Sequence, residues 1–391
     1  MKINISKKLS SFVIAFVLVL LVFSPIIYLH SYVKLHNWLT DFNQHMLWAI
    51  DLETKGMGSL PSYIIAHSGW QISLVATNLI TGFSFQKASF AMALLCIEVT
   101  ALIMLSWFWP AFTKNNFPVW KIAGIILGVN IATPVSMLWV LDKLMYLGYI
   151  GITSYHNPTM YLLKPFALVQ FIFAFKCFNN SPPLGSREVA IAGIVSLLST
   201  FVKPSLSICI LPALGVFAIN RLIKKQYVNL PGIIFGFGIP ITLTLAWQFL
   251  LTYHTNDASG IEFSPFTVMS AYSKYLFLKL LLSILFPLLV LITYFKQAKI
   301  DICMTLGWSV FIFGAFFTYF LSETGARMMD GNFGWSGEIA LFLLFAVSTL
   351  FYLDMPKKRY LTNILQASWL LHFFFGVAYY FYCVFNNNTY F

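Results

Sequence analysis

Residues 10–29 read Ser-Ser-Phe-Val-Ile-Ala-Phe-Val-Leu-Val-Leu-Leu-Val-Phe-Ser-Pro-Ile-Ile-Tyr-Leu and contain no charged side chain. A helix of about 20 apolar residues is long enough to cross the hydrocarbon core of a bilayer. The stretch is long for the apolar core of a signal peptide, and no small-residue cleavage site follows it. It therefore predicts a retained transmembrane helix.

The composition extends this prediction to the whole chain. Hydrophobic residues make up 59% of the 391 positions and charged residues only 9%, against about 25% charged residues in soluble domains. We expect an all-α, polytopic membrane protein that forms one transmembrane domain over residues 1–391. About eleven apolar spans can be drawn, at 10–29, 86–110, 121–142, 160–178, 188–203, 205–220, 230–252, 273–295, 302–322, 338–354 and 361–385.

When these spans alternate across the membrane, most basic residues fall on one side and most acidic residues on the other. The predicted inner segments hold 15 of the 24 basic residues: Lys2, Lys7, Lys8, Lys114, Lys121, Lys176, Arg187, Arg221, Lys224, Lys225, Lys296, Lys299, Lys357, Lys358 and Arg359. Nine of the 13 acidic residues fall on or near the other face: Asp41, Asp51, Glu53, Asp142, Asp257, Glu262, Glu323, Asp330 and Glu338.

Because basic loops remain in the cytoplasm, this pattern predicts a cytoplasmic N-terminus and non-cytoplasmic polar loops. We expect a multi-pass protein of the cell membrane, in a bacterial inner membrane. The bilayer is then the partner of the apolar surface, and the net charge of +11 needs no nucleic acid to explain it.

The first outer loop, residues 30–85, contains the most informative segment, Asp41-Phe-Asn-Gln-His45-Met-Leu-Trp-Ala-Ile-Asp51. Asp41 and His45 are four positions apart and share one face of a helix. An apolar face formed by Phe42, Met46, Ala49 and Ile50 predicts an amphipathic helix at the membrane interface, with Thr40 or Asp41 as its N-cap. A second semi-apolar segment, residues 62–81, follows.

Asp41 is the candidate catalytic residue of this loop. A carboxylate held at the outer leaflet can take a proton from an acceptor hydroxyl, or bind a metal that does so. The alternative is that Asp41 only caps a surface helix. His45 can orient Asp41 or bind a phosphate, and its alternative is a hydrogen-bonded structural histidine.

From this point the chain resembles the GT-C-type glycosyltransferases, multi-span enzymes that use polyprenyl-phosphate-linked sugars. The resemblance rests on Asp41-Phe-Asn-Gln-His45 early in the first outer loop, on the pattern Gly56…Pro61-Ser62…His67 and on the long second span. It covers about residues 10–225. The Asp-Xaa-Asp or Glu-Xaa-Asp pair common in that superfamily is absent. The resemblance implies sugar transfer outside the cytoplasmic membrane with Asp41 as base, and a divalent metal (Mg or Mn) on Asp41 as a possible cofactor.

A second candidate group lies where the third and fourth spans join, in Ser154-Tyr-His156-Asn157-Pro158-Thr159. Pro158 suits the first turn of a helix, so His156 or Asn157 should end the loop. The free N–H groups of such a helix start attract anions. His156, Asn157 and Lys164 therefore form a candidate phosphate site, and the alternative is a capped helix with a snorkelling lysine.

Two further cations are candidate donor-binding residues. Lys203, before Pro204, lies about 24 Å along a helix from Arg187, at the outer end of its span, and must be paired or solvated there. Arg327, in the glycine-rich outer binding loop 323–337, can grip a phosphate with two hydrogen bonds.

The same outer loop supplies two candidate substrate-binding residues, Trp335 and Glu338. Trp335 offers a flat surface for a sugar or an isoprenoid, and its alternative is an ordinary interfacial tryptophan. At the outer mouth of the third span, Asp142 and Lys143 are expected to form a local ion pair.

These features favour a membrane glycosyltransferase that moves a sugar from a polyprenyl-phosphate-linked donor to an envelope glycan, lipid or protein acceptor. A transporter or flippase of a lipid-linked saccharide is the first alternative, and an oligosaccharide polymerase or ligase, which relies on outer arginines and a histidine, is the second. The sequence has no Gly-rich nucleotide loop, no His-Glu-Xaa-Xaa-His helix and no Gly-Xaa-Ser-Xaa-Gly elbow.

Overall fold

The computed structural model describes residues 5–33, 41–180, 182–254, 260–356 and 359–386. Within these ranges the protein is almost entirely helical and has one two-stranded antiparallel sheet. Some residues that carry the predictions above lie outside the described ranges: Lys2, Thr40, Asp257, Lys357 and Lys358.

Among the described residues, seven helical segments are long and apolar enough to cross a membrane, and an eighth is obtained if a bent pair counts as one span. They are α1 with η1 (Ile5–Tyr28 and Leu29–Val33), α5 (Phe85–Lys114), α8 (Pro158–Lys176), α11–η4–α12 (Leu230–Ile233, Ile234–Gly238 and Ile239–Tyr253), α17 (Ile302–Phe320), η5 with α18 (Gly325–Asp330 and Gly334–Asp354) and α19 (Arg359–Phe385). A polytopic helical membrane protein is thus confirmed.

Eleven full spans are not shown. The helices α9 (Ser186–Val202) and α10 (Ser207–Ile223) have 17 residues each, short of the roughly 20 that cross a bilayer. The predicted span 273–295 consists of α14 (Leu276–Ser283) and α15 (Leu285–Thr293), which meet at a bend of 65°. The short helix α16 (Phe295–Ala298) follows.

The predicted span 121–142 is wrong in its second half. Helix α6 (Val119–Ile131) ends after 13 residues, and the chain from 132 to 157 is a folded loop with only a short helix, α7 (Trp139–Asp142). Irregular backbone at membrane depth is tolerated where protein covers it. Here the N–H of Val135 donates to the Leu282 carbonyl (3.2 Å), and that of Ile150 donates to Ser283 Oγ (3.1 Å).

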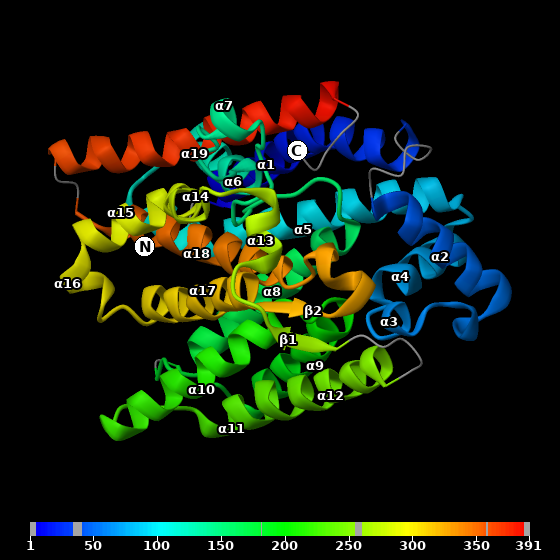
Figure 1. Ribbon diagram of the computed structural model, residues 1–391. Helices are drawn as coiled ribbons and strands as arrows, with labels where there is room; N and C mark the ends of the chain where they lie inside the picture. Colours follow the sequence, from blue (N-terminus) through cyan, green and yellow to red (C-terminus); the bar gives the residue numbers. More distant parts are fainter. Residues whose placement is uncertain (1–4, 34–40, 181, 255–259, 357–358, 387–391) are drawn as a thin grey trace.

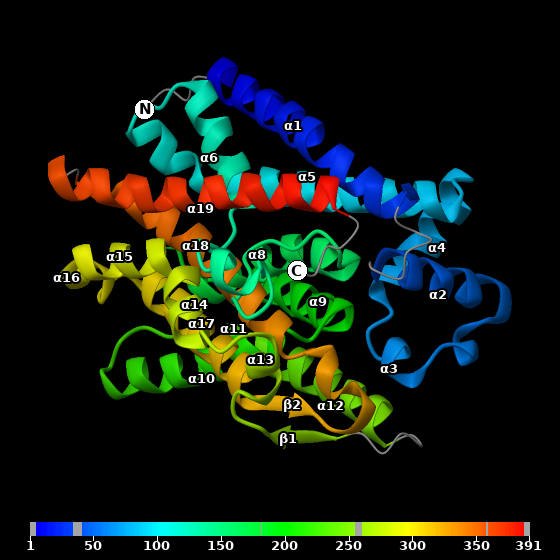
Figure 2. The ribbon, with the colours of Figure 1, turned by 45° about the horizontal axis from the view of Figure 1, so that its top comes forward.

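The helices form layers around α18, as Figures 1 and 2 show. In the most apolar part of α18, 94% of the residues are buried, against 22% for α11–α12, 28% for α1 and 33% for α19. A helix that is apolar all round belongs in an interior or in lipid. Helix α18 is therefore the core, and α1, α12 and α19 present apolar side chains to the bilayer.

Close packing fixes the start of α18 against α17. A Cβ atom on Gly314 of α17 would lie 2.7 Å from the Ala340 Cβ, and one on Gly337 of α18 would meet the Thr318 hydroxyl. Small residues allow membrane helices to approach in this way. The N–H of Gly337 also donates to Thr318 Oγ1 (3.1 Å), so the first turn of α18 is held in place.

The predicted inner and outer segments gather at separate ends of the helices. Lys7 contacts Asn116 (2.9 Å) and Lys114 pairs with Asp354 (3.0 Å), so that predicted inner residues meet one another. The helices of the first outer loop lie at the right of Figure 1, and α16 lies at the left. The helices of the first outer loop are α2 (Asp41–Lys55), η3 (Met57–Ser59), α3 (Ser62–Ile65) and α4 (Gly69–Thr81).

Segments from the second half of the chain complete the predicted outer end. Strands β1 (Ile261–Phe263) and β2 (Leu321–Glu323) pair antiparallel, with Ile261 opposite Glu323, and α13 (Thr267–Tyr272) follows β1. The predicted amphipathic helix exists as α2, but its apolar face is covered by protein: Phe42 packs edge-on against Trp70 of α4 and Tyr161 of α8. A position at the membrane interface stays a prediction.

Candidate active site

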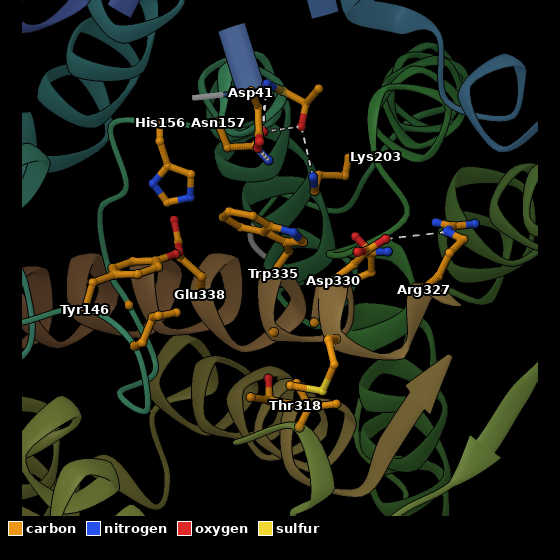
Figure 3. Close-up of a pocket in the computed structure, with 18 of the residues that line it drawn as sticks. Asp41, Tyr146, His156, Asn157, Lys203, Thr318, Arg327, Asp330, Trp335 and Glu338 are labelled. Carbon is orange, nitrogen blue, oxygen red and sulfur yellow. Dashed lines mark hydrogen bonds and ion pairs between the residues drawn. The ribbon is translucent and has the colours of Figure 1, made fainter. Parts of the chain in front are cut away.

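A pocket of about 440 Å³ opens at the predicted outer end, between α2, the loop before α8, the end of α9, η5 and the start of α18. Eight of the nine predicted site residues line it: Asp41, His45, His156, Asn157, Lys203, Arg327, Trp335 and Glu338. Figure 3 shows Trp335 near the middle of this group, with Lys203 and Arg327 on one side and Glu338 on the other. Residues up to 297 positions apart in the chain (from 41 to 338) thus converge on one hollow.

Asp41 stands at the first position of α2 and is tied to the start of α8. Its N–H donates to the His156 carbonyl (3.1 Å), and its Oδ2 accepts from the Asn157 amide (2.7 Å). Its side chain is partly buried and faces the pocket. The carboxylate is therefore oriented by a neutral donor.

Asn157 is the N-cap of α8, as predicted, with Pro158 in the first turn. Its Oδ1 accepts from the N–H groups of Thr159 (3.0 Å) and Met160 (3.4 Å). These two N–H groups are consequently not free for a phosphate, contrary to the sequence-based expectation. The function of Asn157 is to cap α8 and to hold Asp41.

Lys203 follows the last residue of α9, at the outer end predicted for it. Its ammonium donates to Thr159 Oγ1 (2.9 Å) and lies 4.7 Å from the centre of the Trp335 ring. Burial lowers the pKa of Lys203 to about 8, while the charges of Asp41 and Glu338 act to raise it. Among the described residues no carboxylate forms an ion pair with Lys203.

Lys164 does not line the pocket. Its ammonium lies 3.4 Å from Thr153 Oγ1 and 4.8 Å from the centre of the Phe342 ring, at a buried position between α8 and α18. The predicted phosphate contact from Lys164 therefore has no support in the geometry.

Arg327 lies on the same side of Trp335 as Lys203, on η5. Its Nη2 is 3.2 Å from Glu323 Oε1, its Nε is 3.7 Å from Asp330 Oδ2, and its guanidinium stacks 4.4 Å from the Tyr63 ring centre. Tyr253 and Asn332 also donate to Glu323. The guanidinium is thus held in position by a buried carboxylate while one edge faces the pocket.

Glu338 occupies the far side of the pocket, in the first turns of α18. It accepts hydrogen bonds from the Tyr146 hydroxyl (2.5 Å) and the Ser154 hydroxyl (2.7 Å), and only 2% of its surface is exposed. The His156 ring lies beside this group, 5.3 Å from the Tyr146 ring and 5.6 Å from that of Trp335. This side of the pocket therefore holds a buried carboxylate whose two oxygens both accept hydrogen bonds.

The three histidines of the pocket are uncharged near neutral pH. Burial lowers the pKa of His156 to about 4, against the opposing charge of Glu338. Burial, with the charges of Lys203 and Arg327, lowers the pKa of His67 to about 3. Burial also holds the pKa of His45 well below its usual value, and His45 Nδ1 accepts from the Gln71 amide (2.7 Å), which matches the structural alternative.

A second hollow of about 610 Å³ adjoins the pocket. Apolar side chains of α10 and α12 line most of it, among them Ile208, Leu211, Leu245 and Phe249. The pocket and this apolar groove share one wall, formed by His67, Lys203, Arg327, Asn332 and Trp335. The polar pocket and the apolar groove therefore meet at two cations, Lys203 and Arg327.

Sequence reasoning missed several residues of this site. They lie in predicted outer segments: Tyr146, Ser154, Glu323 and Asn332. Their roles follow only from hydrogen bonds between residues 9 to 192 positions apart in the chain, by which Tyr146 and Ser154 hold Glu338, and Asn332 holds Glu323. Asp142 was expected to pair with Lys143, which is wrong: Asp142 Oδ2 lies 2.6 Å from the ammonium of Lys279.

The residues do not form a ready metal site. No group of three or more His, Cys, Asp or Glu side chains in the described ranges is arranged to hold a metal ion. Asp41, the predicted ligand, has one carboxylate oxygen on the Asn157 amide. A divalent cofactor (Mg or Mn) stays a prediction.

Comparison of the chain with protein-family models, with curated proteins and with solved structures finds no match.

Proposed function

We propose that the protein is an integral membrane glycosyltransferase that moves a sugar from a polyprenyl-phosphate-linked donor to a glycan, lipid or protein acceptor of the cell envelope. One observation supports this above the others: the polar pocket and the apolar groove meet at Lys203, Arg327 and Trp335. A lipid-linked sugar has the same three parts in the same order, an apolar chain, an anionic phosphate and a polar sugar.

The apolar groove fits the isoprenoid chain. It lies against α12, which carries exposed apolar side chains including Leu243, Trp247 and Leu250 and belongs to a candidate span. A chain leaving the bilayer beside α12 enters the groove without crossing water. Burial of apolar surface contributes about 25 cal/mol per Å², so the groove can anchor a carrier lipid.

The phosphate then lies at the shared wall, between the two cations. Arg327 offers a planar set of N–H donors, and Lys203 offers a point charge. His67 and His156 remain neutral there and contribute hydrogen bonds rather than charge. With Trp335 beside Lys203, the sugar is placed in the polar pocket, within the outer part of the protein.

Asp41 is proposed as the general base. Its carboxylate takes the proton of an acceptor hydroxyl while that oxygen forms a bond to the anomeric carbon of the sugar. The bond between this carbon and the phosphate oxygen breaks, and the departing negative charge is received by Lys203 and Arg327. The donor leaves as polyprenyl phosphate, so atoms and charge balance without another reactant.

The experiment substitutes Asp41→Asn in the full chain in lipid nanodiscs. The panel of donors contains polyprenyl-phosphate-linked hexoses and pentoses labelled in the sugar, and cell-envelope extract supplies the acceptor. Loss of a general base lowers rates by about 10² to 10⁴, whereas Asn preserves the contact with Asn157, so donor binding should stay near wild type.

Asp51→Asn is the matched control, because Asp51 lies on the same helix and pairs with Lys55 at the surface (2.7 Å). It should transfer sugar at the wild-type rate. Retained turnover in Asp41→Asn would remove Asp41 from the role of base.

One observation favours the transporter alternative. Broken helices are common at transport sites, and α14 and α15 meet at a bend of 65°. However, Ser283 at the bend accepts from Ile150, and the N–H of Phe286 donates to His372. Neither Ser283 nor Ile284 lines the pocket or the groove. Flux of a labelled lipid-linked saccharide across liposomes without sugar transfer would favour transport.

The polymerase or ligase alternative is supported less well. That chemistry relies on several outer arginines and a histidine, and Arg327 is the one arginine among the described residues that line the pocket.

A further inference from the structure

The segment η5 carries both an arginine of the site and a carboxylate that competes for it. Arg327 and Asp330 are three positions apart on this short turn. Glycines with left-handed backbone flank it, Gly325 (φ 71°) and Gly331 (φ 63°), a conformation that glycine adopts without strain. The position of Asp330 over the pocket is therefore set by the turn itself.

The two carboxylate partners of Arg327 differ in how firmly they are held. Glu323 is 4% exposed and accepts from Tyr253 (2.8 Å) and Asn332 (2.5 Å) in addition to Arg327. Asp330 has a side chain that is 55% exposed, and its oxygen lies 3.7 Å from Arg327 Nε. Glu323 is thus a fixed partner, and Asp330 is one that a ligand can displace.

A phosphate that binds Arg327 from the pocket meets the edge beside Asp330, because Glu323 already holds Nη2. We propose that Asp330 determines the phosphate specificity of the site, by admitting a donor with one phosphate and opposing a donor with two. This inference rests on the proposed function and names the residue that selects its donor.

The charge around the shared wall agrees with this assignment. Lys203 and Arg327 are faced by four carboxylates, Asp41, Glu323, Asp330 and Glu338, and the three histidines are neutral. Each additional negative charge on a ligand must therefore be placed among carboxylates.

The test measures equilibrium binding of two tritiated probes, farnesyl phosphate and farnesyl diphosphate, to the full chain in nanodiscs. We expect the wild type to bind the monophosphate more tightly. Asp330→Asn removes one carboxylate charge, so affinity should rise about threefold for the monophosphate and about tenfold for the diphosphate, since tenfold corresponds to about 1.4 kcal/mol. Asp330→Ala should behave in the same way.

Two controls separate the direct contact from a general loss of charge. Glu53→Gln removes an exposed carboxylate of α2 that does not line the pocket and should leave both affinities unchanged. In the Arg327→Gln background, Asp330→Asn should no longer favour the diphosphate.

The outcomes distinguish this inference from the function on which it rests. If Asp330→Asn and Asp330→Ala leave the ratio of the two affinities at the wild-type value, Asp330 does not select the donor. If Arg327→Gln binds both probes as the wild type does, the proposed phosphate position itself is wrong. If no variant binds either probe, both proposals are overturned.

Discussion

Lys203 shows how the environment of one residue can make a site dependent on pH. The ammonium is 9% exposed, yet two carboxylates, Asp41 and Glu338, stabilise its charge from within the same pocket. The pKa of about 8 lies below the usual value of Lys, about 10.4. The charged form therefore predominates below pH 8 and is lost as the pH rises through that value.

We predict that binding of farnesyl phosphate weakens above pH 8, by up to about tenfold per pH unit, since a single proton is involved. The measurement is the dissociation constant between pH 6.5 and 9.5. Lys203→Arg keeps its charge over this range and should bind with little dependence on pH. A wild-type affinity that stays constant to pH 9.5 would show that Lys203 does not hold the phosphate.

Most of the site residues predicted from the sequence line the pocket, because residues of these kinds are unusual in a membrane protein. A lysine in an apolar sequence, a carboxylate after the first span and an Asn-Pro helix start are each costly or distinctive in a membrane protein. Lys164 met the same criterion but faces Thr153 and Phe342. Sequence shows that such a side chain needs a partner, and only the rotation of the helix determines which partner it meets.

The loop 132–157 is the element that sequence reasoning misjudged. Its first part, residues 132–142, was predicted as the second half of the span 121–142, because apolar residues such as Ala132 and Val135 are buried there and continue the hydrophobic pattern of α6. Lys279 holds this loop: its ammonium lies 2.6 Å from Asp142 and donates to the Leu147 carbonyl (2.9 Å), and its side chain is fully buried.

We predict that Lys279→Met destabilises the protein by about 3 kcal/mol, because the partly buried Asp142 carboxylate loses its ion-pair partner and the loop loses the hydrogen bond to Leu147. Thermal unfolding in detergent would show the loss, and hydrogen exchange should rise in residues 142–157. Asp142→Leu in the Lys279→Met background should restore part of the stability. Lys143→Met, which removes an exposed neighbour, is the control, and equal damage from it would contradict the assignment.

The whole molecule combines a polar end, which holds the predicted outer segments, with an apolar body. Composition and charge predicted this arrangement, because a bilayer imposes it on any polytopic chain. Neither could predict how α1, α5, α8, α17 and α18 pack, since lipid-facing and protein-facing surfaces are equally apolar. The close approach of α17 and α18 depends on single glycines, Gly314 and Gly337, which carry no signal in the hydrophobic pattern.

The predicted orientation is tested by labelling single introduced cysteines in intact cells with a membrane-impermeant maleimide. Asp51→Cys on α2 should react at once, and Lys225→Cys, after α10, should react only after the membrane is permeabilised. Both positions are accessible in the structure, and four of the five native cysteines are buried. The reverse pattern would invert the assigned sides.

The loop 132–157 also has a consequence for biosynthesis. Its partners Leu282, Ser283 and His372 are translated more than 120 residues after the backbone groups that they satisfy. While the ribosome is still producing the second half of the chain, those groups have no native partner in the bilayer. The wall that carries Tyr146 and His156 can therefore mature only late, once the final helix has been inserted.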